Sequence, residues 1–211
     1  MEKIIFHKET KTFHLYNKEI SYIMCVLENG HMGQLYYGKR IHDKPDFSYL
    51  VEKCGRPMTS YIFEGDRSFS LEHIRQEYPV YGTTDYRHPA IEIMQENGSN
   101  ISEFKYVGYE ILKGKPSLKG LPATYTESEE EAETLKIILK DSLTGAKLTL
   151  LYTIFSKGSA IARSAHICNE GEKVLHLQTM MSLNLDLPDK DYVWMQLSGA
   201  WSRERYVKNR I

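Results

Sequence analysis

The chain has 211 residues, of which 41% are hydrophobic and 26% are charged, and its 27 Lys and Arg against 28 Asp and Glu give a formal charge of −1. These values are typical of a soluble globular protein of one large or two small domains, and they exclude a chain that is mainly disordered. The balanced charge also argues against nucleic acid as a partner, because binding phosphates requires a surplus of Lys and Arg on one face.

The sequence shows no membrane or secretory signal. No apolar run approaches the ~20 residues that cross a bilayer, and residues 1–3 lead into a short mixed segment rather than an apolar signal core. We therefore expect no membrane partner and a cytoplasmic location.

Four pairs of segments rich in β-branched and aromatic residues are separated by short polar turns, which is the pattern of β-hairpins. In the first pair, residues 20–27 and 34–37 flank Asn29-Gly30, a dipeptide that tolerates the positive φ of a tight turn. The other pairs are residues 91–95 and 101–112 around 97–99, residues 134–140 and 147–155 around 142–145, and residues 159–168 and 174–186 around 169–172.

Strands joined by short turns, with few stretches at helical spacing, predict an all-β fold: a large antiparallel β-sandwich, or supersandwich, with few short helices. Residues 45–56 and 63–88 lack this pattern and are expected to be long, aromatic-rich connections. Such loops in a compact domain are usually functional or disordered, and their Tyr and Phe content argues against disorder.

The candidate metal-ligating residues do not form a convincing site. Cys25, Cys54 and Cys168 suit neither a disulfide framework nor a CxxC clip, so buried free thiols are expected. His166 and His176 lie near Cys168, but no second pair with ligand spacing accompanies them. We predict no metal and no cofactor.

Hydrolytic motifs are also incomplete, since neither a Gly-x-Ser-x-Gly elbow nor a phosphate-binding loop is present. Asp186, Asp189 and Asp191 cluster around Pro188, and paired carboxylates are what glycosidic cleavage requires. The two catalytic carboxylates normally come from different elements, however, so this cluster is expected to satisfy turn amides.

The last segment, residues 194–211, carries both tryptophans, Trp194 and Trp201, followed by Arg203 and Arg205. It ends without Gly, Pro or a polar tail, from which we expect a chain truncated from a longer protein. We expect Trp194, Arg203 and Arg205 to form an interface with an absent domain or another subunit, because large exposed apolar patches tend to find partners.

Four strings resemble, in the same order, the amino-terminal region of the α-galactosidases of glycoside hydrolase family 36. They are GQLYYGK at residues 33–39, QEYPVYGTTD at 76–85, GLPATY at 120–125 and QLSGAWSRER at 196–205. The last string is long and specific, and the resemblance covers essentially the whole chain.

The resemblance implies that residues 1–211 are the N-terminal β-sandwich domain of a bacterial enzyme that hydrolyses terminal α-galactosides of the melibiose or raffinose type, truncated before a (β/α)₈ catalytic barrel. In the family both catalytic aspartates lie in that barrel and act by the retaining mechanism. No residue of this chain is therefore assigned a catalytic role. The implied partners are α-galactoside sugars through the parent enzyme, the chain's own barrel, and further copies in a homo-oligomer, which is a tetramer in the family.

The resemblance also implies that the sandwich can lend a loop to the rim of an active site. Asp46, in a loop that resembles the family's acidic loop, would accept a hydrogen bond from a sugar hydroxyl, and a plain turn aspartate is the alternative. Trp201 would either stack on galactose or fill the seam between sandwich and barrel. In the second case Arg203 and Arg205 would pair with barrel carboxylates.

The alternative function is a stand-alone galactoside-binding β-sandwich module that uses exposed aromatic side chains such as Tyr36, Tyr37, Tyr78 or Tyr81. The sequence leaves open which galactoside is preferred, and whether the parent is a galactosidase or an N-acetylgalactosaminidase.

Overall fold

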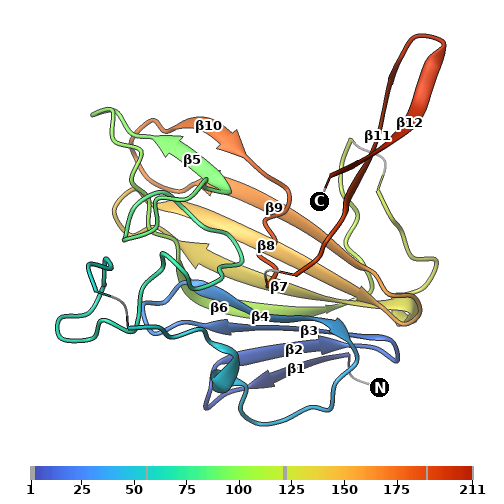
Figure 1. Cartoon of the computed structure of the whole chain (residues 1–211), viewed down its shortest axis with the longest axis horizontal. Helices are drawn as coiled ribbons and strands as arrows, with labels where there is room; N and C mark the ends of the chain where they lie inside the picture. Colours follow the sequence, from blue (N-terminus) through green and yellow to red (C-terminus); the bar gives the residue numbers. More distant parts are fainter. Residues whose placement is uncertain (1–2, 56, 121–122, 189, 211) are drawn as a thin grey trace.

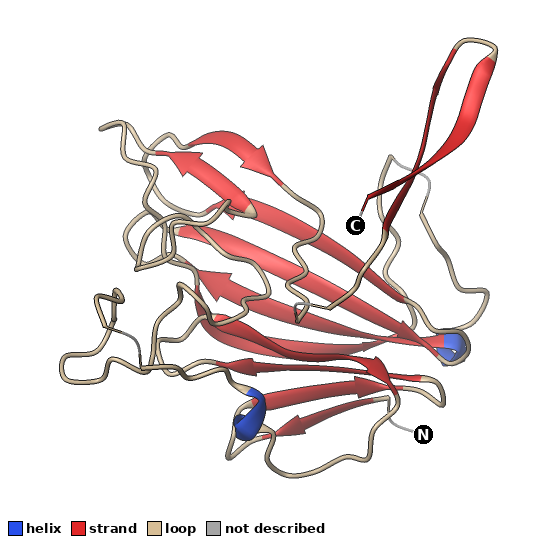
Figure 2. Cartoon of the chain, in the orientation of Figure 1, coloured by secondary structure: helices blue, strands red, loops and turns tan. Residues whose placement is uncertain are grey.

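The computed structural model describes residues 3–55, 57–120, 123–188 and 190–210. Within them the chain is almost entirely strands and loops, and its strands are antiparallel (Figures 1 and 2), which confirms the predicted all-β class. Its only helical turns there are η1 (Ser48–Leu50) and η2 (Glu129–Glu131). None of the helices described is long and apolar enough to cross a membrane.

The first sheet has four strands in chain order: β1 (Ile4–His7), β2 (Thr12–Tyr16), β3 (Ile20–Val26) and β4 (Met32–Lys39). The predicted hairpin at Asn29-Gly30 is confirmed, because β3 pairs with β4 around a turn in which Gly30 has φ +88°. A side chain at this φ would be strained, so the glycine suits the turn.

The second sheet also follows chain order, with β6 (Lys105–Lys113), β7 (Ala132–Lys140), β8 (Ala146–Phe155) and β9 (Ile161–Asn169). The predicted hairpin between β7 and β8 is confirmed, and Gly145 in its turn has φ +76°. Alternate residues of both strands point inward, so that one face of the sheet is buried and the other is partly exposed.

The main core lies between the two sheets. One cluster of buried side chains joins residues of both, including Phe13, Leu15, Leu135, Leu150 and Tyr152. Face-to-face packing of two antiparallel sheets is what defines a β-sandwich. A second, smaller cluster covers the other side of the first sheet and buries Phe47, Phe69 and Leu71 from the long connections.

The predicted hairpin around Asn97-Gly98 is wrong as a strand pairing. The turn forms, because the Gln95 amide donates to the Ser99 carbonyl at 2.9 Å. However, β5 (Ile91–Met94) pairs with β10 (His176–Met180) and not with β6. After the turn, Phe104 is buried in the core, and the chain crosses into the second sheet.

The predicted pairing of residues 159–168 with 174–186 is also wrong. The polar turn after β9 exists, with the Asn169 side chain donating to the Lys173 carbonyl at 2.8 Å. After this turn β10 does not pair with β9. It is a short strand that pairs with β5. The partner of β10 is therefore β5, a strand far away in the sequence. A local turn pattern does not predict a pairing between strands so far apart in the sequence.

The long connections are confirmed, since residues 57–88 contain no strand longer than an isolated bridge and residues 45–55 contain only η1. All three cysteines are free. The expectation that they are buried holds for Cys25, whereas Cys54 is exposed and Cys168 is half-buried. Cys54 is exposed because it lies in the surface connection that leads from η1.

Candidate functional site

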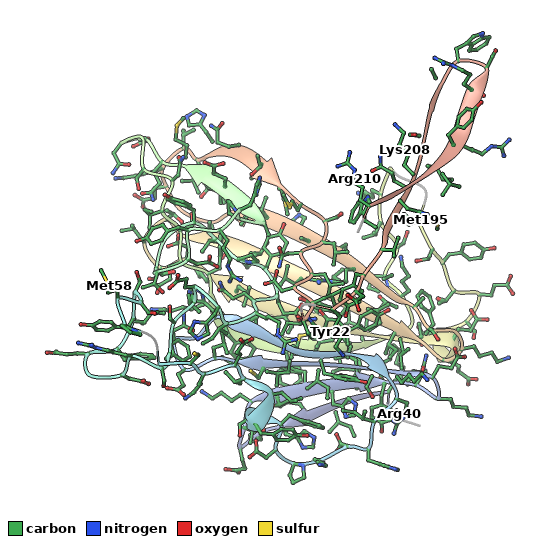
Figure 3. All side chains as sticks on the ribbon, viewed as in Figure 1. Tyr22, Arg40, Met58, Met195, Lys208 and Arg210 are labelled. Carbon is green, nitrogen blue, oxygen red and sulfur yellow. The ribbon has the colours of Figure 1, made fainter. Side chains whose placement is uncertain are left out.

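The last two strands, β11 (Trp194–Ala200) and β12 (Arg203–Arg210), form a hairpin that projects away from both sheets (Figure 1). Its residues are almost all exposed. Trp194 is 67% exposed, and Trp201, in the turn, is 92% exposed. In Figure 3 the labelled side chains of Met195, Lys208 and Arg210 stand clear of the sandwich.

Both faces of this hairpin carry large apolar side chains. Trp194 and Tyr206 lie on one face, and Leu197 pairs with Val207 on the other. A two-stranded ribbon of this length is only marginally stable alone in water. These side chains are exposed to solvent, and Arg203 and Arg205 lie at the end of the hairpin that carries Trp201.

Asp46 lies in the connection between β4 and η1 and is exposed. Its carboxylate accepts the Ser48 amide at 2.7 Å and the Ser48 hydroxyl at 3.1 Å. These bonds lower the pKa of Asp46, which keeps the group ionised. A carboxylate with exposed lone pairs can still accept a hydroxyl from a sugar, so both the turn role and the rim role are compatible with this geometry.

The structure does not bring the candidate rim residues together. Asp46 adjoins η1 at one end of the sandwich, whereas Trp201 is in the turn of the projecting hairpin at the other (Figure 1). Of the carboxylates expected in turns, Asp186 lies 3.7 Å from Arg87, and Asp189 lies outside the described residues. Among the described residues, no three His, Cys, Asp or Glu side chains form a group that could hold a metal ion.

The aromatic side chains named for a binding module have different environments. Tyr78 is buried, with its hydroxyl bonded to the Met181 carbonyl, so it is excluded as an exposed contact. Tyr81 is 40% exposed and packs edge-on against the exposed Tyr86, with ring centroids 5.5 Å apart. A turn in which Thr83 and Thr84 both have positive φ holds this pair.

A buried ionic cluster, which the sequence did not reveal, ties the connection 63–88 to both sheets. Glu77 is fully buried and accepts hydrogen bonds from the hydroxyls of Tyr22 on β3 and Tyr152 on β8, each at 2.8 Å. Arg163 on β9 lies 3.3 Å from the same carboxylate. Burial raises the pKa of Glu77, and Arg163 and the two hydroxyls oppose that rise.

A second cluster missed by the sequence analysis has the order of a catalytic triad. The Ser21 hydroxyl lies 2.9 Å from His14 Nε2, and His14 Nδ1 lies 2.7 Å from Asp43. Ser21 and His14 are fully buried, however, and the Ser21 oxygen also accepts the Ile41 amide. A nucleophile needs access to substrate, so this arrangement is structural.

Two buried histidines predict a pH-dependent stability. Burial lowers the pKa of His14 and of His31. Since the folded pKa lies below the unfolded one, the unfolded chain binds more protons as the pH falls, and folding loses stability below about pH 6.5. We expect the free energy of unfolding, measured with urea, to fall from pH 7 to pH 5. His14→Gln and His31→Gln should each reduce this slope, and a flat profile would contradict the assignment.

Comparison with known proteins decides the family. The glycosyl hydrolase family 36 N-terminal domain matches residues 30–211. The chain belongs to this family. The family 36 alpha-galactosidase AgaA of Geobacillus stearothermophilus is 42% identical over 98% of the chain and 28% of its own length, and Mel36A of Lactobacillus acidophilus is 34% identical over 97% and 28%.

Solved alpha-galactosidase structures share the fold described above. The crystal structure of the alpha-galactosidase from Lactobacillus brevis has a TM-score of 0.93 at 38% identity, covering 98% of the chain and 28% of that protein. AgaA in complex with raffinose has a TM-score of 0.89 at 42% identity, covering 95% and 28%. The chain thus spans about 28% of the length of these relatives.

Proposed function

We propose that this chain is the non-catalytic N-terminal domain of an α-galactosidase that hydrolyses terminal α-galactosides of the melibiose and raffinose type. The observation that carries the proposal is the match to the family's N-terminal domain, together with 42% identity to an α-galactosidase solved in complex with raffinose. A relative of this identity that also shares the backbone supports a shared role for the domain.

The chemistry of the complete protein would lie outside this chain. Retaining hydrolysis of a glycoside needs one carboxylate as the nucleophile and a second as the acid and base, about 5 Å apart across the sugar. We infer that both lie in a (β/α)₈ barrel in the part of the relatives that this chain does not cover. The sandwich then serves as support for the barrel.

We infer that the β11–β12 hairpin is the main surface through which the sandwich contacts the rest of the protein. It carries exposed apolar side chains on both faces, and Trp194, Trp201, Arg203 and Arg205 together offer aromatic and cationic groups. Aromatic residues and arginine are the residues that most often dominate protein interfaces. The surface they meet would be the barrel or another copy in a homo-oligomer.

Asp46 is proposed as a residue of the active-site rim, where its carboxylate would accept a hydrogen bond from a substrate hydroxyl. The connection that leads into η1 lies away from the projecting hairpin (Figure 1), which favours an arrangement in which this loop and the hairpin make different contacts. If Trp201 also reaches substrate, the two residues would come from different copies of the chain, which fits an oligomeric enzyme.

The second candidate function, a stand-alone galactoside-binding module, is favoured by the exposed Tyr81–Tyr86 pair. Titration of the isolated chain with raffinose by calorimetry separates the two functions. The domain role predicts no saturable heat at millimolar sugar. Saturable binding that Tyr86→Ala abolishes and Tyr125→Ala, on a different loop, preserves would support the module and refute the domain role as the whole function.

A further inference from the structure

The loop that carries Asp46 is fastened to the first sheet by a continuous chain of hydrogen bonds. Asp43 Oδ1 accepts from His14 Nδ1 at 2.7 Å and from His7 Nε2 at 3.0 Å. Ser21 bonds to the other nitrogen of His14 and accepts the Ile41 amide at 3.1 Å. Residues 41 and 43 of the loop are therefore tied to β1, β2 and β3.

The direction of each bond follows from the groups involved. A carboxylate accepts only, so His14 must carry its proton on Nδ1 and His7 must donate through Nε2. The Ser21 oxygen accepts the Ile41 amide and lies 2.9 Å from His14 Nε2. In a neutral His14 protonated on Nδ1, Nε2 accepts the Ser21 hydroxyl. The lowered pKa of buried His14 agrees with this state.

Two further contacts hold the loop on either side of Asp46. The Thr10 hydroxyl donates to the Pro45 carbonyl at 3.1 Å. Phe47 is fully buried and packs edge-on against the His14 ring, with centroids 5.5 Å apart. Asp46 is thus the exposed residue between two fixed neighbours, and its position depends on the histidines beneath it.

We propose that His14 and Asp43 are positioning residues: they fix the loop of residues 41–47 on the sheet and thereby set where Asp46 meets the substrate. This inference rests on the proposed rim role of Asp46. The cluster of Ser21, His14 and Asp43, whose buried serine cannot reach a substrate, then serves to hold this loop in place. The ligand that the loop addresses is a hydroxyl group of an α-galactoside.

The test uses the complete protein that contains this chain, with raffinose as the substrate. Asp46→Ala should raise KM about tenfold and leave kcat within about twofold, because one hydrogen bond made equally to substrate and transition state is lost. Asp43→Ala should raise KM about three- to tenfold. Asp43→Asn should keep KM within about twofold, because the amide oxygen still accepts from both histidines.

A double variant shows whether Asp43 acts through Asp46. Asp43→Ala combined with Asp46→Ala should be no worse than Asp46→Ala alone, since residues of one unit are not additive. Asp66 provides a matched control, because its carboxylate accepts the Ser68 amide and hydroxyl at 2.8 and 2.6 Å just as Asp46 accepts those of Ser48. Asp66→Ala should leave KM unchanged.

Amide exchange gives a second readout that does not depend on the reaction. Exchange over residues 41–47 should accelerate in Asp43→Ala and not in Asp46→Ala. If Asp46→Ala raises KM while Asp43→Ala changes neither KM nor exchange, the positioning role is wrong and the rim role stands. If Asp46→Ala leaves KM unchanged, the rim role fails, and the positioning proposal fails with it.

If Asp43→Ala does not yield folded protein, His7→Ala is the variant that tests the same proposal. It removes one of the two bonds to Asp43 from a partly exposed position. A rise in KM of about two- to fivefold with faster loop exchange is expected, and no change in either overturns the proposal.

Discussion

Glu77→Ala is expected to lower the free energy of unfolding by about 3–5 kcal/mol, because breaking a buried ion pair leaves its partner charge uncompensated. The partner is Arg163, and the substitution also removes the acceptor of the Tyr22 and Tyr152 hydroxyls. We expect this loss of unfolding free energy to be large because the contacts of Glu77 join the connection 63–88 to β3, β8 and β9. Urea unfolding of the chain, followed by circular dichroism, measures it.

Glu110→Ala is the matched control. Glu110 forms an ion pair with Lys136 at 3.0 Å, but both side chains reach solvent. Such exposed pairs contribute roughly 0–1 kcal/mol. Equal effects of the two substitutions would contradict the view that the buried cluster holds the connection to the sandwich.

Trp201→Ala is expected to weaken self-association of the isolated chain by about 30- to 1000-fold in Kd, which is the effect of removing one dominant interface residue worth about 2–4 kcal/mol. The reason is the exposure of the indole on a hairpin that projects from the domain. Sedimentation velocity at several concentrations measures the association of the original chain and the variant.

Tyr125→Ala is the control for this experiment, since Tyr125 is 78% exposed but lies outside the hairpin. It should leave the association unchanged. A chain that is monomeric at every concentration, or one whose association is indifferent to Trp201, would show that the hairpin is not the contact surface.

Local turn chemistry made the two central hairpins predictable. Gly30 and Gly145 have positive φ in their turns, and alternating apolar residues on each side fix which face is buried. The same turn pattern gave a wrong strand pairing at Asn97-Gly98, where the turn forms but the following residues enter the second sheet as β6. The partner of β5 lies more than 80 residues away, and no local pattern encodes that choice.

The two buried polar clusters were less predictable for a related reason. Asp43 is 29 residues from His14, and Glu77 is 75 residues from Tyr152, so only the fold brings each pair together. The exposure of Trp194 and Trp201 agrees with an interface, although the contact itself stays a prediction. The sequence contained one signal for the buried ionic cluster. Glu77 is a charged residue within the string QEYPVYGTTD, which carries the family resemblance, and such a position suggests that its charge has a partner.

The most direct test of the domain role compares the complete protein with the isolated chain in the hydrolysis of an aryl α-galactoside. The complete protein should release the aryl group, and residues 1–211 alone should show no turnover above buffer, because the pair of carboxylates that retaining hydrolysis needs is proposed to lie outside this chain. Turnover by the isolated chain that persists through further purification would contradict the account, and so would a complete protein that leaves α-galactosides intact.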